Sequence, residues 1–221
     1  MDQYLAHILA RRCRFCGWAR EYESDGLSRL LGVYQQQALD VLRPTQQDIL
    51  LDVGCGTRAA IRRAAFTVQQ AIGVDACPRM IDRAQQLGAG LKRAGFVVAV
   101  TERLPFADGV FTALLCTAVL RHVSDRTAVA REMARVLRPG GRVVLGDFVP
   151  ELRRTGIHAA RRLDIEAATV PLSRADLRIG SNIVCSTPLG PYLITHATKA
   201  CRNSRHRTGA AARSGLTIGG R

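Results

Sequence analysis

The chain has 221 residues, of which 47% are hydrophobic, and it carries a net charge of +14. This length predicts one sizeable domain with appendages, and the hydrophobic content is typical of a globular protein. No apolar run reaches the roughly 18 residues that a membrane-spanning helix needs, and the N-terminal arginines precede no apolar run of the secretory type. We therefore expect no membrane span and a location in the cytoplasm.

Cysteine usage and charge bear on the compartment and the partner. Seven cysteines are scattered through the expected strands and helices, which favours a reducing compartment over a disulfide framework. The positive charge raises the prospect of a nucleic-acid partner. However, the basic residues are dispersed, and the clearest clusters are Arg153-Arg154, Arg161-Arg162 and the tail over residues 201–221, which contains no acids. Nucleic acid, bound through this basic tail, is therefore the second choice of partner.

Residues 1–45 are predicted to be helical. Leu27, Leu31 and Tyr34 recur at helical spacing, and Pro44 ends the pattern. The pair Cys13-x-x-Cys16 has the spacing of half a zinc site. Because no second pair of ligands follows, two reduced cysteines on a helix are the better interpretation, and we expect no metal.

The most informative stretch is residues 49–75. A short apolar run leads into Asp52, a turn with Gly54-x-Gly56, a helical segment, and a second apolar run that ends at Asp75. This order predicts a strand, a glycine turn, a helix and a parallel strand joined by a right-handed crossover. Glycines let a ligand approach the backbone, and a carboxylate at the tip of the second strand can accept hydrogen bonds from both hydroxyls of a ribose. The pattern therefore predicts a site for an adenosine cofactor.

The remaining chain continues the alternation of strands and helices. Further strands are expected over residues 96–100, 110–116 and 142–148, and helices over 77–87 and from 126 to Pro139. Beyond these, we expect a helical segment over 151–169 and another helix that starts at 173–177. The chain should then form a terminal hairpin of strands 183–185 and 192–195, which turns at 188–191. This alternation predicts an α/β fold, a Rossmann-like, doubly wound, mostly parallel sheet with an antiparallel edge hairpin. The expected divisions are a helical cap over residues 1–45, a cofactor-binding domain over 46–200 and a disordered basic tail over 201–221.

Two cofactors fit the glycine turn itself. Gly54-x-Gly56-x-x-Ala59 can be aligned with the dinucleotide pattern, whereas S-adenosylmethionine (SAM) has a ribose but no pyrophosphate. Three blocks in the expected order resemble class I SAM-dependent methyltransferases, and within them the branch that includes ubiquinone and menaquinone biosynthesis enzymes: residues 51–57 (LDVGCGT), 102–108 (ERLPFAD) and 131–142 (REMARVLRPGGR). The resemblance covers residues 49–149 well and implies SAM as the cofactor and methyl transfer to a small-molecule acceptor at oxygen, nitrogen or carbon.

The resemblance also implies roles for individual residues. The backbone of Gly54, Cys55 and Gly56 would contact the cofactor, Asp75 would hold the ribose, and Asp52 would organise the methionine end. The adenine would be surrounded by residues from two later segments, and the backbone carbonyl of Cys116 would accept a hydrogen bond from the amino group of the cofactor. The residues expected around the adenine are Ala76, Met80, Glu102, Arg103 and Leu104.

His122 is the candidate general base. It lies in Val119-Leu120-Arg121-His122-Val123, which resembles a family segment of the type Val-Leu-His-His-Val. A histidine titrates near neutrality and can accept a proton from a hydroxyl or amine. The alternative is a structural histidine that bonds a loop backbone. Methyl transfer needs no obligatory base, because orientation alone can supply on the order of 7–11 kcal/mol.

Three departures from the family pattern keep other functions open. Arg58 stands where glycine is usual, Val100 where an adenine-binding aspartate is frequent, and Thr112 where the fourth strand often has aspartate. A non-catalytic SAM-binding relative is therefore one alternative. A nucleic-acid (RNA) methyltransferase is another, but the chain lacks an Asn/Asp-Pro-Pro-Tyr/Phe motif after the fourth strand and has no Pro-Cys dipeptide. A nucleotide-dependent dehydrogenase is the last alternative.

Overall fold

The structure is a computed structural model that describes residues 15–17, 19–22, 24, 26–57, 59–148, 169–185, 187 and 191–201. Its centre is a seven-stranded sheet in the order β3-β2-β1-β4-β5-β7-β6. The first five strands pair in parallel, and β7 is antiparallel to both β5 and β6. The strands are β1 (Ile49–Val53), β2 (Gln70–Asp75), β3 (Ala94–Val98), β4 (Phe111–Thr117), β5 (Leu137–Phe148), β6 (Leu177–Cys185) and β7 (Tyr192–Lys199).

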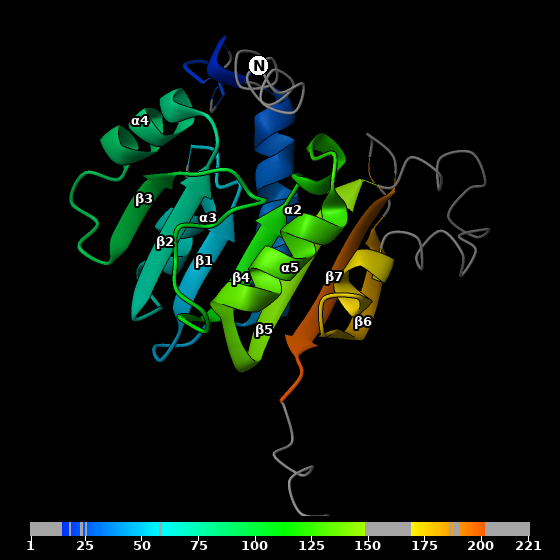
Figure 1. Cartoon of the computed structure of the whole chain (residues 1–221). Helices are drawn as coiled ribbons and strands as arrows, with labels where there is room; N and C mark the ends of the chain where they lie inside the picture. Colours follow the sequence, from blue (N-terminus) through cyan, green and yellow to red (C-terminus); the bar gives the residue numbers. More distant parts are fainter. Residues whose placement is uncertain are drawn as a thin grey trace, which may run out of the picture.

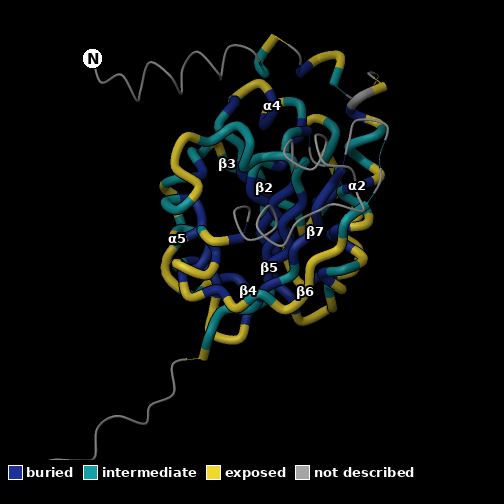
Figure 2. Tube along the Cα trace, turned by 90° about the vertical axis from the view of Figure 1, so that its right-hand side faces the viewer, coloured by how far each residue is buried: buried dark blue, intermediate teal, exposed yellow. Residues whose placement is uncertain are grey.

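Helices cover both faces of the sheet (Figure 1). On one face, α2 (Gly26–Leu42) and α3 (Ala59–Ala64) pack Leu42 and Ile61 into an apolar cluster with alternate residues of β1 and β4. On the other, α5 (Arg126–Val136) contributes Val129 and Met133 to a second cluster. β4 is buried along its whole length, as expected of a central strand covered on both faces. Figure 2 shows the central strands of the sheet, such as β1 and β4, as the buried centre of the molecule, whereas the edge strands β3 and β6 are intermediate or exposed over most of their length.

The fold class predicted from the alternation of elements is confirmed, together with two helix starts. Pro78 occupies the first turn of α4 (Pro78–Leu87), where its missing N–H costs no hydrogen bond. Asp125 caps α5, because its side chain accepts a hydrogen bond from the backbone N–H of Ala128 at 2.9 Å. Local signals of this kind act within a few residues, so they survive in the folded chain.

Two predicted helix boundaries are wrong. The helix expected to reach Pro139 ends at Val136, and β5 already begins at Leu137, which pairs with Phe111 before the register shifts. The helix expected to start over residues 173–177 is also misplaced: residues 169–173 are helical, and Leu177 opens β6. In both cases pairing with a neighbouring strand overrides a local helical pattern, since Leu177 pairs with Lys199 of β7.

Several predictions lie outside the described residues. These are Cys13 and Arg58, the helical segment over residues 151–168, the hairpin turn at 188–190, and the tail beyond Cys201. Among the helices of the described residues, none is long and apolar enough to cross a membrane.

The two edges of the parallel sheet differ in what they carry. We call the edge formed by the carboxyl ends of β1 to β5 the carboxyl edge, and the opposite one the amino edge. The order of strands reverses between β1 and β4, and in such sheets ligands bind at the carboxyl ends beside this switch. The described N-terminal residues, dark blue at the top of Figure 1, lie over the carboxyl edge.

Candidate functional site

The glycine turn after β1 has a backbone that only glycine adopts without strain. Gly54 and Gly56 have φ angles of +74° and +54°. The backbone N–H groups of Gly54 and Cys55 both donate to the carbonyl of Val74, at 2.8 and 2.9 Å. A side chain at Gly54 would collide with the Val119 methyl groups, so this turn is closely packed against the segment after β4.

Asp52 is the most unusual group of the site. Its side chain is fully buried at the end of β1, and within the described part of the chain neither of its carboxylate oxygens has a hydrogen-bond partner. Burial, and secondarily the charge of Asp75, raise the pKa of Asp52 to about 7. A buried acid without partners is unfavourable unless a cation or a hydrogen-bond donor meets it. The position is therefore suited to a positively charged ligand group.

Asp75 ends β2 and holds the turn together. Its Oδ2 accepts from the Gly56 N–H at 3.0 Å, and its Oδ1 accepts from the Cys77 N–H at 2.8 Å. Burial raises the pKa of this carboxyl, and the two backbone hydrogen bonds lower it in part. A carboxylate has about four lone-pair sites, so two remain for a ligand. Gly56 and Asp75, which the sequence pattern singled out together, are thus joined by a direct hydrogen bond.

The cap segment, which we define as residues 15–17 and 19–22, crosses the carboxyl edge above these groups. The Phe15 ring packs edge-on against His122, with ring centroids 5.1 Å apart. Ala19 is buried together with Cys77 and Met80. At the other end, ring atoms of Tyr22 lie 3.8 Å from the position that a Cβ on Gly56 would occupy. This segment therefore shields the glycine turn and the start of α4 from water.

The residues expected around an adenine lie on two neighbouring loops, after β2 and after β3. Ala76 is partly buried next to Asp75, and Met80 is buried by the cap segment. Leu104 is buried, and Glu102 accepts a hydrogen bond from the Thr101 hydroxyl at 2.9 Å. Arg103, by contrast, is exposed.

Cys116 completes the set of sequence-predicted cofactor residues. It is buried near the end of β4 and pairs with Leu145 of β5. Burial raises the pKa of the Cys116 thiol well above its usual range, and the charges of Asp147 and Asp52 add to that effect. The electrostatic effect of Asp52 puts the thiol in the same neighbourhood as the unpaired acid.

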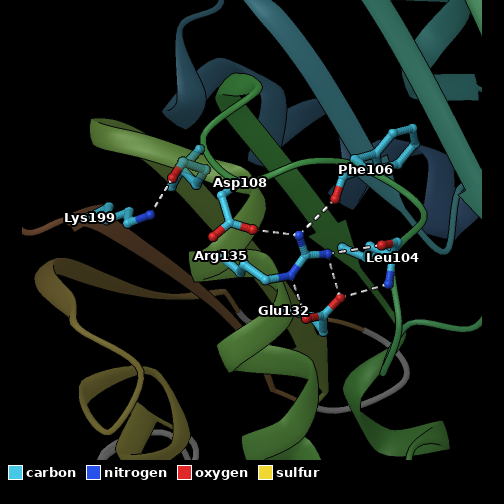
Figure 3. Close-up of polar contacts among 7 residues, drawn as sticks. Leu104, Phe106, Asp108, Glu132, Arg135 and Lys199 are labelled. Carbon is cyan, nitrogen blue, oxygen red and sulfur yellow. Dashed lines mark hydrogen bonds and ion pairs between the residues drawn. The ribbon is translucent and has the colours of Figure 1, made fainter.

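Two side chains of α5, Glu132 and Arg135, hold the loop that carries Leu104 through hydrogen bonds, and we call this pair the latch (Figure 3). Arg135 donates to the carbonyls of Leu104 and Phe106, at 2.9 and 2.7 Å, and to Asp108 at 2.8 Å. Glu132 pairs with the same guanidinium at 2.7 Å and accepts from the Leu104 N–H at 2.8 Å. The second and third family-like blocks are thus joined by hydrogen bonds, and Arg135 is the residue that links them.

His122 lies at the far side of the edge, in the short 3₁₀ helix η1 (Leu120–His122). Its Nε2 accepts a hydrogen bond from Arg121 Nε at 3.1 Å. Arg121 also donates to Asp147 through its backbone N–H and its Nη1, at 3.1 and 2.8 Å, and its guanidinium lies over the Phe148 ring. The lone pair that would accept a proton is therefore already engaged.

Sequence reasoning missed the latch and the Arg121–Asp147 pair, whereas it did expect the N-terminal residues to form a cap. The Glu132–Arg135 spacing of three residues on a helix was a readable signal for a side-chain pair. The contacts of Phe15, Ala19 and Tyr22 had no local signal, because they bring together segments far apart in the chain.

The departures from the family pattern differ in their structural setting. Thr112 has a structural role: its hydroxyl donates to Asp48 Oδ1 at 2.6 Å and accepts from the Ile49 N–H at 3.0 Å, both at the amino edge. Val100 is partly buried in the loop after β3, and its carbonyl accepts from the Arg103 N–H.

A comparison with protein families and curated proteins identifies relatives of the central segment. Residues 51–145 match the model of a methyltransferase domain. A demethylmenaquinone methyltransferase of Mycolicibacterium vanbaalenii is 37% identical over 138 residues, covering 61% of this chain and 58% of the relative. The 27-O-demethylrifamycin SV methyltransferase of Amycolatopsis mediterranei is 36% identical, covering 51% and 43%. The chain thus spans about half the length of the curated relatives that it matches.

Solved structures share the fold. A SAM-dependent methyltransferase from Aquifex aeolicus superposes with a TM-score of 0.65 at 17% identity, covering 82% of this chain and 98% of that one. The YcgJ protein from Bacillus subtilis superposes with a TM-score of 0.63 at 18% identity, covering 75% and 97%. At such identities the likeness concerns the arrangement of strands and helices.

Proposed function

We propose that this chain, which carries a methyltransferase domain of the class I SAM-dependent superfamily, transfers a methyl group from SAM to a small-molecule acceptor at oxygen, nitrogen or carbon. The relatives named as demethylmenaquinone and demethylrifamycin methyltransferases support an acceptor of this class. The observation that carries the proposal is the buried carboxyl of Asp52 beside the glycine turn, which has no hydrogen-bond partner among the residues that the structure describes.

Asp52 favours SAM over a dinucleotide on electrostatic grounds. SAM has an ammonium group and a sulfonium centre, and a buried carboxylate gains most from a nearby positive charge. A dinucleotide would instead bring its anionic pyrophosphate to the same turn, where Asp52 and Asp75 would repel it. We therefore propose that Asp52 binds the methionine end of the cofactor.

The other cofactor contacts are proposed from the same edge. The backbone of Gly54, Cys55 and Gly56 would contact the methionine and ribose portions, and the free lone pairs of Asp75 would accept the ribose hydroxyls. The Cys116 carbonyl would bind the amino group. We propose that the adenine lies between the loops after β2 and β3, near Ala76, Met80, Glu102, Arg103 and Leu104.

When bound, SAM supplies a methyl group on a positively charged sulfur that departs as a neutral thioether. The chain then has to hold the acceptor in line with that methyl group and exclude water, which supplies most of the needed rate enhancement. The cap segment serves the second purpose by covering the edge. His122 can serve as a general base only after Arg121 releases its Nε2, so we propose that it positions the acceptor rather than removing a proton.

We also propose how the chain is divided and in which compartment it works. Residues 1–45 would cap the cofactor and form part of the acceptor wall, residues 46–200 would form the SAM-binding domain, and residues 201–221 a basic tail. We propose a reducing compartment, the cytoplasm, because the six cysteines in the described ranges are free thiols.

Calorimetric titration with S-adenosylhomocysteine tests the proposal. We expect micromolar binding by the wild type, at least tenfold weaker binding by Asp52→Asn, and wild-type binding by Asp82→Asn, an exposed acid on α4 that serves as the matched control. Affinity should rise about tenfold from pH 6 to pH 8, because a carboxyl with a pKa of about 7 must ionise to meet a cation. Asp52→Asn should lose this pH dependence.

The alternatives give different results in the same experiment. No binding of S-adenosylhomocysteine, or tighter binding of NAD, would contradict the proposal. Binding of S-adenosylhomocysteine without methylation of any acceptor would identify a non-catalytic relative. Methylation of RNA that is lost when residues 201–221 are removed would identify a nucleic-acid methyltransferase that binds through its tail.

A further inference from the structure

The cap segment meets α4 through a pair of cysteines. Cys16 is partly buried in the cap segment, and Cys77 is buried at the N-terminus of α4. Cys16 packs against the buried cluster that Cys77 forms with Ala19 and Met80. The two cysteines are 61 positions apart in the chain, so the contact is a product of the fold.

The two thiols differ in their exposure to solvent, and this difference gives them different roles. Cys16 is accessible enough to meet a small molecule from solvent, whereas 2% of Cys77 is exposed. Burial, and then the neighbouring Cys16 thiol, raise the pKa of the Cys77 thiol to about 12. Cys77 is therefore kept as a protonated thiol beside its more accessible partner.

We propose that Cys16 and Cys77 form a reversible disulfide under peroxide, a covalent modification site that ties the cap segment to the carboxyl edge. Cys16 already packs against the cluster that holds Cys77, and the two sulfurs must approach to about 2.05 Å for the bond. Cys16 is the half of the Cys13-x-x-Cys16 motif that the structure describes, and this pairing gives it a partner other than Cys13.

The reaction balances with a peroxide as the oxidant. The Cys16 sulfur attacks one peroxide oxygen, the O–O bond breaks, and a sulfenic acid and the first water form. The Cys77 sulfur then attacks the Cys16 sulfur, the S–O bond breaks, and its hydroxyl leaves with the Cys77 proton as the second water. Two thiols lose two electrons and two protons in total, and a reducing thiol reverses the step.

The disulfide would sit next to the groups that hold the turn. The backbone N–H of Cys77 donates to Asp75, and the same cap segment places Tyr22 over Gly56. A covalent tie at Cys77 therefore fixes the segment that covers the glycine turn. This consequence, unlike the disulfide itself, rests on the proposed function: oxidation should slow the exchange of S-adenosylhomocysteine.

Peptide mapping after treatment of the folded protein with hydrogen peroxide tests the disulfide without any ligand. Trypsin separates the cysteines, because residues 15–20 contain only Cys16, residues 64–79 contain only Cys77, and Cys13 falls in the dipeptide before Phe15. We expect a disulfide-linked pair of peptides 15–20 and 64–79 that a reducing thiol separates. It should be absent in Cys16→Ser and in Cys77→Ser, and kept in Cys201→Ser, which removes an exposed thiol elsewhere.

Other products would overturn the proposal. A Cys13–Cys16 disulfide as the main product, or separate sulfinic acids on the two peptides, would exclude the proposed pair. Where the disulfide forms, we expect the dissociation of S-adenosylhomocysteine to slow roughly tenfold in the oxidised protein, and an unchanged rate would refute its effect on the site. A protein that forms the disulfide but binds no S-adenosylhomocysteine would contradict the proposed function and leave the modification site in place.

Discussion

Two acids at opposite ends of β1 have opposite environments. Asp48, at the amino edge, is buried and fully engaged: it accepts from Arg142 at 2.7 Å, from Thr112 at 2.6 Å, and from both the backbone and the hydroxyl of Thr45. Asp52, at the carboxyl edge, is just as buried and has no hydrogen-bond partner among the described residues. Aspartate thus stabilises the fold at the start of β1, whereas near its end the same residue type has no partner in the part of the chain that the structure describes.

The pKa values of the two acids move in opposite directions. Burial raises the pKa of Asp48, but the hydrogen bonds from Arg142, Thr112 and Thr45 outweigh it and lower the value to about 2. The pKa of Asp52 rises to about 7 because no such bonds compensate its burial. The difference teaches that the amino edge stabilises the fold, whereas the carboxyl edge keeps an unfavourable group that a ligand can satisfy.

Arg142→Ala should remove the cation that pairs with Asp48 and have the largest effect on stability. It removes the ion pair with Asp48 and a hydrogen bond to the carbonyl of Leu42, leaving a buried carboxylate without its cation. We expect a loss of about 3 kcal/mol in the free energy of unfolding, measured by denaturant titration. Arg138→Ala, an exposed arginine on the same strand, should cost less than about 0.5 kcal/mol. Equal effects of the two variants would contradict the role of Asp48.

Asp52→Asn should raise the stability of the ligand-free protein, whereas Arg142→Ala lowers it. Between about pH 4 and pH 7 the native protein keeps a proton on Asp52 that the unfolded chain has lost, so wild-type stability falls as the pH rises through this window. Asparagine removes that dependence, and we expect the ligand-free variant to be about 2 kcal/mol more stable at pH 8, with the gain shrinking toward pH 5. A variant less stable than wild type at pH 8 would mean that Asp52 is paired in solution.

Arg135→Lys tests whether the latch positions the carboxyl edge. Lysine keeps the charge but cannot reach Glu132, Asp108 and the two loop carbonyls together, because it lacks the planar fork. We expect a loss of about 1–2 kcal/mol in stability and roughly fivefold weaker binding of S-adenosylhomocysteine. Arg131→Lys, on an exposed position of the same helix, is the control and should change neither measurement.

Replacing two strained residues by glycine should have the smallest effect on stability. Arg43, near the amino edge, and Ala118, at the carboxyl edge, have φ angles of 50° and 60°, which disfavour any side chain. Arg43→Gly and Ala118→Gly should each stabilise the protein by about 0.5 kcal/mol in thermal unfolding, since relief of strain exceeds the entropy that glycine adds to the unfolded chain. Only Ala118→Gly should alter the affinity for S-adenosylhomocysteine. An equal change in Arg43→Gly would argue that the two edges are coupled.

The fold was predictable because its signals are local and repeated. Apolar runs, Pro78, Asp125 and the glycines after β1 each specify their own segment, and their order along the chain specifies an α/β sheet. The contact between Asp75 and the glycine turn was also predictable, because the spacing of a parallel crossover leads both to the same edge. Boundaries failed where strand pairing decided them, as at Leu137 and Leu177.

The sequence by itself determined the class of fold, and it indicated the edge that carries the candidate site and the glycines and acids placed there. The tertiary structure alone decided that Asp52 has no hydrogen-bond partner within the described ranges while Asp48 has several, that Arg135 joins two distant blocks, and that Cys16 meets Cys77. The reason is physical: periodicity and turn chemistry act over a few residues, whereas burial and hydrogen-bond partners depend on which distant segments the sheet brings together.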